Sequence, residues 1–206
     1  MKLGTVGVIG RFKPLHNGGA VMLETLCQNA DCVKIGIGSS NRYNARNPFT
    51  AQESKEMIDR FLSKKYSNYE FIFVQDFGHI PEYSNGQKWK QCIVEQYGKL
   101  DCFVTGNEYV ASLLESDYKI IHPSNLIPKD EQIMLRATEV RIEMSRFGEW
   151  KKLVPNEVSD YLEEKGLVER FRKEFGLETL AKLAEGENFS SFESKEKEKS
   201  HVVNGV

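Results

Sequence analysis

The stretch LGTVGVIGRFKPLHNGGAVMLETLCQNA, residues 3–30, holds the pattern that decides the fold. Residues 3–9 form a short apolar run that is typical of a buried strand. Residues 10–19, GRFKPLHNGG, include Pro14 and two adjacent glycines and therefore predict a loop. From residue 20 onward apolar side chains recur at helical spacing. The stretch thus predicts a strand, a loop and a helix in that order.

The alternation of strands and helices continues along the chain. Further strands are expected at residues 33–40, 70–76, 100–106 and 118–123, further helices at 51–62, 88–98 and 107–116, and a turn passing into a helix at 133–148. Thr50 and Glu53 form a capping-box pattern at the start of the helix at 51–62. The alternation predicts an α/β fold with a Rossmann-like parallel sheet of five or six strands, helices on both faces and additional C-terminal helices.

The composition divides the chain into three parts. We expect an α/β domain at residues 1–150 and a C-terminal helical extension at 151–184, interrupted near Pro155. The tail at 185–206 is rich in Glu, Lys and Ser and poor in apolar residues, which predicts a flexible segment.

The charge and cysteine content exclude several classes of protein. The formal net charge is -2, from 28 basic and 30 acidic residues, so no nucleic-acid partner is expected. No signal peptide is recognised, and no apolar run approaches the roughly 20 residues that span a bilayer, so no membrane partner is expected. The four cysteines form no C-x-x-C pair, which favours reduced thiols in a cytoplasmic protein without a protein-held metal site.

The unusual loops are all expected at one edge of the sheet. Residues 10–19, 38–47, 76–87 and 105–108 each follow a predicted strand, and ligands of parallel sheets bind at the carboxyl ends of the strands. The first of these loops lies before a helix N-terminus, which is a phosphate-binding position. Neither the G-x-G-x-x-G pattern nor the G-K-[ST] pattern is present there.

The first loop carries three possible cations within six residues: Arg11, Lys13 and His16. Together with helix amide groups, such a cluster suits a triphosphate. Gly18 is expected to let a ligand approach the backbone closely.

The sequence GRFKPLHNGG resembles the G-R-F-x-P-x-H-x-G-H signature of the H-x-G-H nucleotidyltransferase superfamily, and it is most similar to that of the archaeal-type nicotinamide mononucleotide adenylyltransferases. Four further segments resemble that family in the family's order: IGIGSSNRYNARNPFTAQE, VTGNEYV, RATEVR and GEWKKLVP. The resemblance covers residues 3 to about 160 and identifies 1–150 as a nucleotidyltransferase domain.

The resemblance implies transfer of the AMP moiety of ATP to a mononucleotide phosphate, with release of pyrophosphate. Nicotinamide mononucleotide is the leading acceptor, which makes the product NAD. Mg²⁺, or another divalent ion, is expected to bridge the phosphate oxygens of the co-substrate ATP. The resemblance further implies a homo-oligomer that binds small-molecule nucleotides.

The resemblance also implies roles for individual residues. The predicted catalytic residues are His16, Arg141, Lys13 and Arg11. The predicted ATP-binding residues are Gly10, Arg11, Phe12, His16, Gly18, Gly106, Asn107, Thr138 and Arg141. Asp76, Trp89, Ser39 and Arg46 are predicted to bind the acceptor nucleotide. Two structural alternatives stay open, since Trp89 could belong to the core and Asp76 could cap a turn.

Three positions depart from the family pattern. Gly19 replaces the second histidine of H-x-G-H, Arg136 replaces a small hydroxyl residue, and Ser54 stands where a basic residue often follows. Loss of one donor to the transferring phosphate typically costs ~100- to 1000-fold in rate. We hypothesise that Lys13 and two nearby arginines, Arg42 and Arg46, compensate, because a cation can bind the same oxygens.

The departures leave three functional hypotheses. The first is an adenylyltransferase, and the second is a relative that uses another phosphate acceptor or CTP. The third is a catalytically weakened nucleotide-binding sensor or assembly protein. Gly19 and Arg136 favour the third hypothesis, whereas His16 and the TEVR ending favour the first two.

Overall fold

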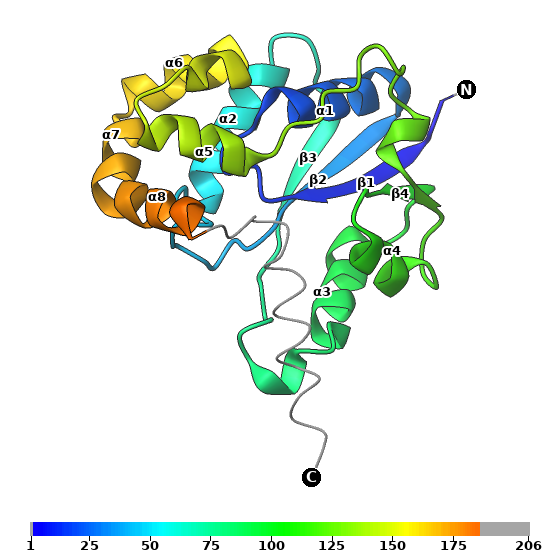
Figure 1. Ribbon diagram of the computed structural model, residues 1–206. Coiled ribbons are helices and arrows are strands. Elements are labelled where there is room, and N and C mark those ends of the chain that lie inside the picture. Colours follow the sequence, from blue (N-terminus) through cyan, green and yellow to red (C-terminus); the bar gives the residue numbers. More distant parts are fainter. Residues whose placement is uncertain (1, 186–206) are drawn as a thin grey trace.

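The parallel sheet reverses its strand order next to the first strand. The computed structural model describes residues 2–185 and has one five-stranded sheet with the spatial order β3-β2-β1-β4-β5 (Figure 1). The strands are β1 Thr5–Gly10, β2 Cys32–Ile37, β3 Tyr69–Phe73, β4 Cys102–Val104 and β5 Ile120–Ile121, and all pairs are parallel. Strands β2 and β3 lie on one side of β1, and β4 and β5 on the other. The carboxyl ends of β1 and β4 therefore form a topological switch point, where such sheets bind ligands.

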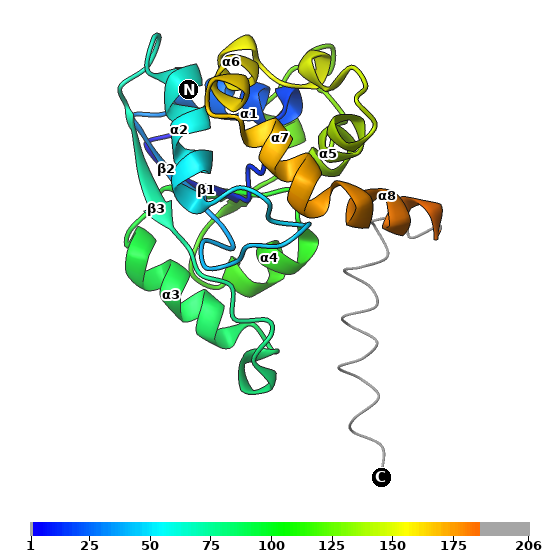
Figure 2. The same ribbon diagram turned by 90° about the vertical axis from the view of Figure 1, so that its left-hand side faces the viewer.

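Helices cover both faces of the sheet, as Figures 1 and 2 show. The α-helices are α1 Asn17–Asn29, α2 Ala51–Leu62, α3 Gln87–Tyr97, α4 Glu108–Leu114, α5 Ala137–Ser145, α6 Asn156–Glu164, α7 Leu167–Phe171 and α8 Leu177–Ala184. The short helices are η1 Pro81–Tyr83, η2 Pro123–Asn125 and η3 Trp150–Leu153, and η4 Arg172–Gly176 is a π-helical segment. Helices α3 and α4 cover one face, and α1, α2 and α5–α8 lie on the other side (Figure 1). The predicted fold class, with C-terminal helices, is confirmed.

Each face of the sheet has its own hydrophobic cluster. The larger cluster joins β1, β2 and β4 to α1, α2 and α5–α7, with Leu23, Ile35 and Met57 fully buried. The second cluster lies under α3 and α4 and centres on Tyr97 and Phe103. Two packed layers on one sheet hold the strand ends in fixed positions, which is what a site at that edge requires.

A glycine in the middle of β2 is explained by Tyr97. The Tyr97 hydroxyl donates to the Val8 carbonyl at 2.9 Å, so its ring reaches across the sheet. A Cβ atom at Gly36 would lie 1.8 Å from that hydroxyl oxygen. Glycine is therefore required there by close packing.

Two helix boundaries follow the predicted local signals. The Thr50 hydroxyl accepts from the Glu53 amide at 3.1 Å, and the Glu53 carboxylate accepts from the Thr50 amide at 2.8 Å. This capping box starts α2 where the sequence predicts it. Helix α3 ends at Gly98, which has a φ of 60°.

The start of α1 differs from the prediction. Residues 18 and 19 were expected in a loop, but the helix begins at Asn17 and includes both glycines. The His16 side chain caps the helix, which compensates for the low helix propensity of two glycines in the first turn.

The C-terminal helices pack into the larger cluster through Val158, Leu162 and Phe171, among others, and they are interrupted at Pro155 as predicted. The predicted tail at 185–206 lies, apart from Glu185, outside the described residues. Among residues 2–185, no helix is both long and apolar enough to cross a bilayer.

Candidate active site

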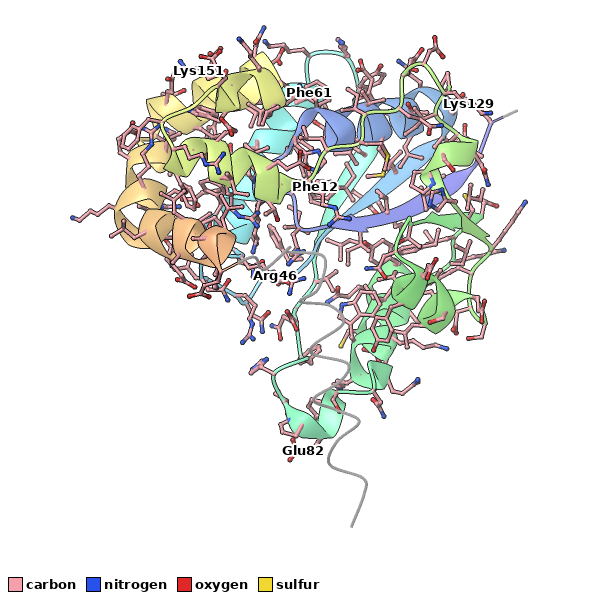
Figure 3. All side chains as sticks on the ribbon, in the orientation of Figure 1. Phe12, Arg46, Phe61, Glu82, Lys129 and Lys151 are labelled. Atoms are coloured by element: carbon pink, nitrogen blue, oxygen red, sulfur yellow. The ribbon has the colours of Figure 1, made fainter. Side chains whose placement is uncertain are left out.

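The predicted catalytic residues come together at the carboxyl end of β1. The loop after this strand carries Arg11, Lys13 and His16 and leads into α1. Arg141 reaches the same loop from α5, and the loop at 38–49 adds Arg46. Figure 3 labels Phe12 and Arg46 near this edge of the sheet.

His16 is both a helix cap and a hydrogen-bond donor. Its Nδ1 accepts from the Gly19 amide at 3.2 Å, so in the neutral ring the proton is on Nε2. Burial and the charge of Arg141 lower the His16 pKa from 6.5 to about 4. The imidazole is therefore neutral at pH 7, and its Nε2–H group can donate to a phosphate oxygen.

Arg141 is a buried cation with no carboxylate partner within the described part of the chain. Only 4% of the residue is exposed. Its guanidinium donates to the Lys13 carbonyl at 2.9 Å and to the Thr138 hydroxyl at 3.1 Å. Burial and the charges of Arg11 and Arg46 lower its pKa well below the ordinary value of an arginine, to about 9. A buried positive charge of this kind is complementary to an anion that arrives from solution.

Lys13 joins two loops of the site. Its side chain is fully buried, and its amine donates to the Ser39 carbonyl at 2.9 Å. Burial and the charge of Arg11 lower the Lys13 pKa to about 8, against opposing effects of Asp76 and Glu53. The amine thus has a structural partner, and direct contact of Lys13 with phosphate stays a prediction.

Gly10 and Gly18, on the two sides of the first loop, are required by the protein's own packing. Phe12 has a φ of 51°, and its ring lies over Gly10, where an added Cβ would be 2.8 Å from the ring. A Cβ at Gly18 would lie 2.6 Å from the Ile133 carbonyl oxygen. The close approach expected at Gly18 is therefore made by the backbone that precedes α5, and a contact of Gly18 with ATP stays a prediction.

Asp76 caps a turn and connects two loops. One carboxylate oxygen accepts from the Gly78 amide at 2.9 Å, and the other accepts from the Ser39 hydroxyl at 3.2 Å. Asn41 makes two hydrogen bonds to the backbone of Asp76, at 3.0 and 2.8 Å. The turn-capping alternative for Asp76 is thus observed, and its role with an acceptor nucleotide stays a prediction. The sequence analysis did not single out Asn41.

The other predicted binding residues lie on the far side of the switch point. Asn107 caps α4, because its side-chain oxygen accepts from the Val110 amide at 3.1 Å. Gly106 is exposed and precedes this cap. Trp89, on α3, is partly buried and packs against the second cluster. Among residues 2–185, no hydrogen bond, ion pair or ring contact joins these three to His16.

The three departures from the family pattern have distinct surroundings. Gly19 is buried, and a Cβ there would lie 3.2 Å from a Leu15 methyl carbon. Arg136 is the N-cap of α5, where its backbone amide donates to Glu139 at 3.0 Å but its side chain makes no capping hydrogen bond. Ser54 is fully buried, and its hydroxyl donates to the Thr50 carbonyl at 3.1 Å.

The described residues offer no ready-made metal site. No group of three or more His, Cys, Asp or Glu side chains between residues 2 and 185 is arranged to hold a metal ion. Both carboxylate oxygens of Asp76 already accept hydrogen bonds. A divalent ion at this site is therefore best supplied together with the phosphates of a nucleotide.

A parallel sheet with cationic loops at its switch point is the arrangement of an α/β nucleotide-binding protein. Residues 8–197 match the family model described as cytidylyltransferase-like, and the chain belongs to this family. Two curated relatives are nicotinamide-nucleotide adenylyltransferases. The one from Thermococcus sibiricus is 34% identical over 80% of this chain and 86% of its own length. The one from Pyrococcus furiosus is 34% identical over 80% of this chain and 85% of its own length.

A solved structure supports the fold. A bifunctional NMN adenylyltransferase/ADP ribose pyrophosphatase from Francisella tularensis, complexed with AMP and a manganese ion, is similar with a TM-score of 0.66 and 20% identity. The match covers 82% of this chain but only 52% of that protein, so this chain spans about half its length. The family resemblance predicted from the sequence is confirmed.

Proposed function

We propose that the protein transfers the AMP moiety of ATP to nicotinamide mononucleotide, forming NAD and pyrophosphate. The observation that carries the proposal is the buried Arg141 beside neutral His16, next to the positive charges of Arg11 and Arg46. This cluster suits a triphosphate, and the relatives that share 34% identity are nicotinamide-nucleotide adenylyltransferases.

The reaction is an in-line displacement at the α-phosphorus of ATP. A phosphate oxygen of the acceptor forms the new P–O bond, and the bond from the α-phosphorus to the bridging oxygen breaks, so that pyrophosphate leaves with the electron pair. The protein's contribution is positioning and stabilisation of charge. His16 Nε2–H donates to an oxygen of the transferring phosphate. Arg141, Thr138 and the first amides of α5 hold the leaving pyrophosphate.

The remaining roles follow the family resemblance. Gly106 and Asn107 contact the adenosine, while Ser39, Asp76 and Trp89 contact the acceptor nucleotide. Arg46, which the resemblance assigns to the acceptor, is assigned here to the triphosphate, because its charge acts on Arg141. A divalent ion, which we propose to be Mg²⁺, enters with ATP and neutralises phosphate charge.

The experiment that tests the function is a matrix of donors and acceptors. Pyrophosphate release is measured with Mg²⁺ for ATP and CTP, each with nicotinamide mononucleotide and several other phosphomonoesters. Turnover with ATP and nicotinamide mononucleotide supports the proposal. Turnover with CTP or with another acceptor would change the substrate and keep the reaction type, nucleotidyl transfer. CTP is the first alternative donor because the matching family is described as cytidylyltransferase-like. Binding of ATP without any turnover would favour the sensor or assembly hypothesis.

Two narrower proposals concern the state of the protein. We propose a homo-oligomer, to be measured by light scattering of the purified chain. We also propose that it works in the cytoplasm. All four cysteines are free thiols, which suits a reducing compartment.

A further inference from the structure

The π-helical segment η4 contacts two parts of the candidate site at once. Arg172 Nε donates to the Met144 carbonyl at 2.8 Å, and its guanidinium lies 4.1 Å from the centre of the Phe147 ring. Met144 lies in the last turn of α5, the helix that carries Arg141, and Phe147 follows the end of this helix. On its other side, η4 contacts the loop at 38–49, which carries Arg46. Figure 2 shows this loop beneath α7 and the start of α8.

Tyr43 is the residue of this loop that η4 holds. Its hydroxyl donates a hydrogen bond to the Glu174 carboxylate. Its ring meets the Phe175 ring edge-on, with 5.3 Å between centroids. Burial and the bond to Glu174 raise the Tyr43 pKa to about 12, so the phenol remains a donor at neutral pH.

A second contact fixes the same loop from α7. The Arg170 guanidinium lies 5.7 Å from the centre of the Tyr43 ring. It also donates to both carboxylate oxygens of Glu53, at 2.6 and 2.8 Å, and to the Pro48 carbonyl at 3.2 Å. The loop is therefore attached to the C-terminal helices at Tyr43 and again at Pro48.

Between these two attachments, a rigid turn carries Arg46. The Asn44 side-chain oxygen accepts from the Arg46 amide at 3.1 Å and from the Asn47 amide at 3.0 Å. The backbones of Asn44 and Asn47 pair as well, with an amide-to-carbonyl distance of 2.8 Å. A displacement of Tyr43 would therefore be passed to Arg46. The same loop is joined to Arg141 through Lys13, whose amine donates to the Ser39 carbonyl at 2.9 Å and whose own carbonyl accepts from Arg141 at 2.9 Å. The charge of Arg46 also lowers the Arg141 pKa.

We propose that Tyr43, held by the π-helical segment, is a positioning residue that fixes Arg46 beside Arg141 for triphosphate binding. Tyr43 itself touches no reacting atom. The contacts of Tyr43 and Pro48 hold the loop at 38–49 in place without a nucleotide. Nucleotide binding therefore does not have to supply the free energy that ordering this loop would cost. The expected effect on turnover rests on the proposed function. The expected effect on tripolyphosphate binding rests on the anion site alone.

The test combines Tyr43→Ala, Tyr43→Phe and Arg46→Ala with the double variant Tyr43→Ala/Arg46→Ala. The matched control is Tyr66→Ala. The Tyr66 phenol also donates to a carboxylate, that of Glu24, at 3.3 Å. Tyr66 precedes β3 and therefore lies at the amino ends of the strands, whereas the candidate site lies at their carboxyl ends. Calorimetry measures the Kd of inorganic tripolyphosphate, which needs neither adenine nor acceptor. Steady-state assays measure KM for ATP and for nicotinamide mononucleotide, and thermal unfolding gives Tm.

We expect Tyr43→Ala to weaken tripolyphosphate binding and raise KM for ATP roughly tenfold, and Tyr43→Phe, which keeps the ring, roughly threefold. KM for nicotinamide mononucleotide should change less than about twofold, and the double variant should be no weaker than Arg46→Ala alone. The inference is overturned if the effects of Tyr43→Ala and Arg46→Ala multiply in the double variant, or if Tyr66→Ala weakens binding equally at a similar Tm. A wild-type protein that binds tripolyphosphate but makes no NAD would refute the proposed function, and the binding data would still decide the role of Tyr43.

Discussion

Replacing His16 by asparagine separates the two tasks of this side chain. His16 caps α1 through Nδ1 and leaves Nε2–H for a phosphate oxygen. Asparagine is among the best N-cap residues, so the free energy of unfolding at pH 7.5 should change by less than about 0.5 kcal/mol. The amide N–H groups of the shorter side chain do not extend to the position of Nε2, so the donor to the phosphate is lost. We therefore expect kcat/KM to fall roughly 100- to 1000-fold.

The same variant should remove a pH dependence of stability. The His16 pKa is 6.5 in the unfolded chain and about 4 in the folded one. Between these values the unfolded state binds the proton and the folded state does not, so stability falls as the pH is lowered. At pH 5 the difference between the two pKa values raises the unfolding equilibrium constant by a factor of about 30. This lowers the free energy of unfolding by about 2 kcal/mol relative to pH 7.5.

The assay is urea unfolding of the wild type and His16→Asn at pH 7.5 and pH 5. Other groups titrate in this range, so the quantity of interest is the difference between the two proteins. The wild type should lose about 2 kcal/mol more than the variant on acidification. Equal losses of unfolding free energy in the two proteins would refute the conclusion that the His16 imidazole is buried and neutral in the folded state. An undiminished kcat/KM would refute its role as a phosphate donor.

Three further substitutions, together with one control at Arg60, test the charges and the packing around the site. Arg141→Met removes a buried cation without a carboxylate partner, so the Tm of the ligand-free protein should stay the same or rise. Stabilisation by tripolyphosphate should disappear. A Tm lowered by more than about 5 °C would contradict this expectation. Gly19→His places a Cβ 3.2 Å from a leucine methyl carbon, and it should cost about 1 kcal/mol of stability. The hypothesis that neighbouring cations compensate predicts a rise in kcat of less than about tenfold, and a gain of about 100-fold would show that they do not compensate. Arg170→Met leaves the Glu53 carboxylate without its partner and should cost about 2 kcal/mol in urea unfolding. The same change at Arg60, whose ion pair is exposed, should cost much less, and equal losses would count against the Arg170 pair.

Features that depend on neighbouring residues could be predicted from the sequence. The capping box of Thr50 and Glu53 and the glycine end of α3 at Gly98 both involve groups within one turn of helix. The start of α1 could not, because Gly18 and Gly19 are typical of loops and only the side-chain cap from His16 overrides that preference.

Individual hydrogen bonds and ion pairs between distant residues could not be predicted. The partner of the Lys13 amine is a carbonyl 26 residues away, and Arg170 pairs with a carboxylate 117 residues away. No sequence pattern indicates either pairing before the fold brings the loops together. The backbone that approaches Gly18, at Ile133, is likewise set by tertiary packing.

Adenylyl transfer is proposed at the site formed by His16 and Arg141. The most direct test incubates the purified chain with ATP, Mg²⁺ and nicotinamide mononucleotide and quantifies NAD and pyrophosphate together by chromatography. We expect both products in a one-to-one ratio, with the rate falling roughly 100- to 1000-fold in His16→Asn. No NAD from a protein that binds ATP, or NAD formation unaffected by His16→Asn, would contradict it.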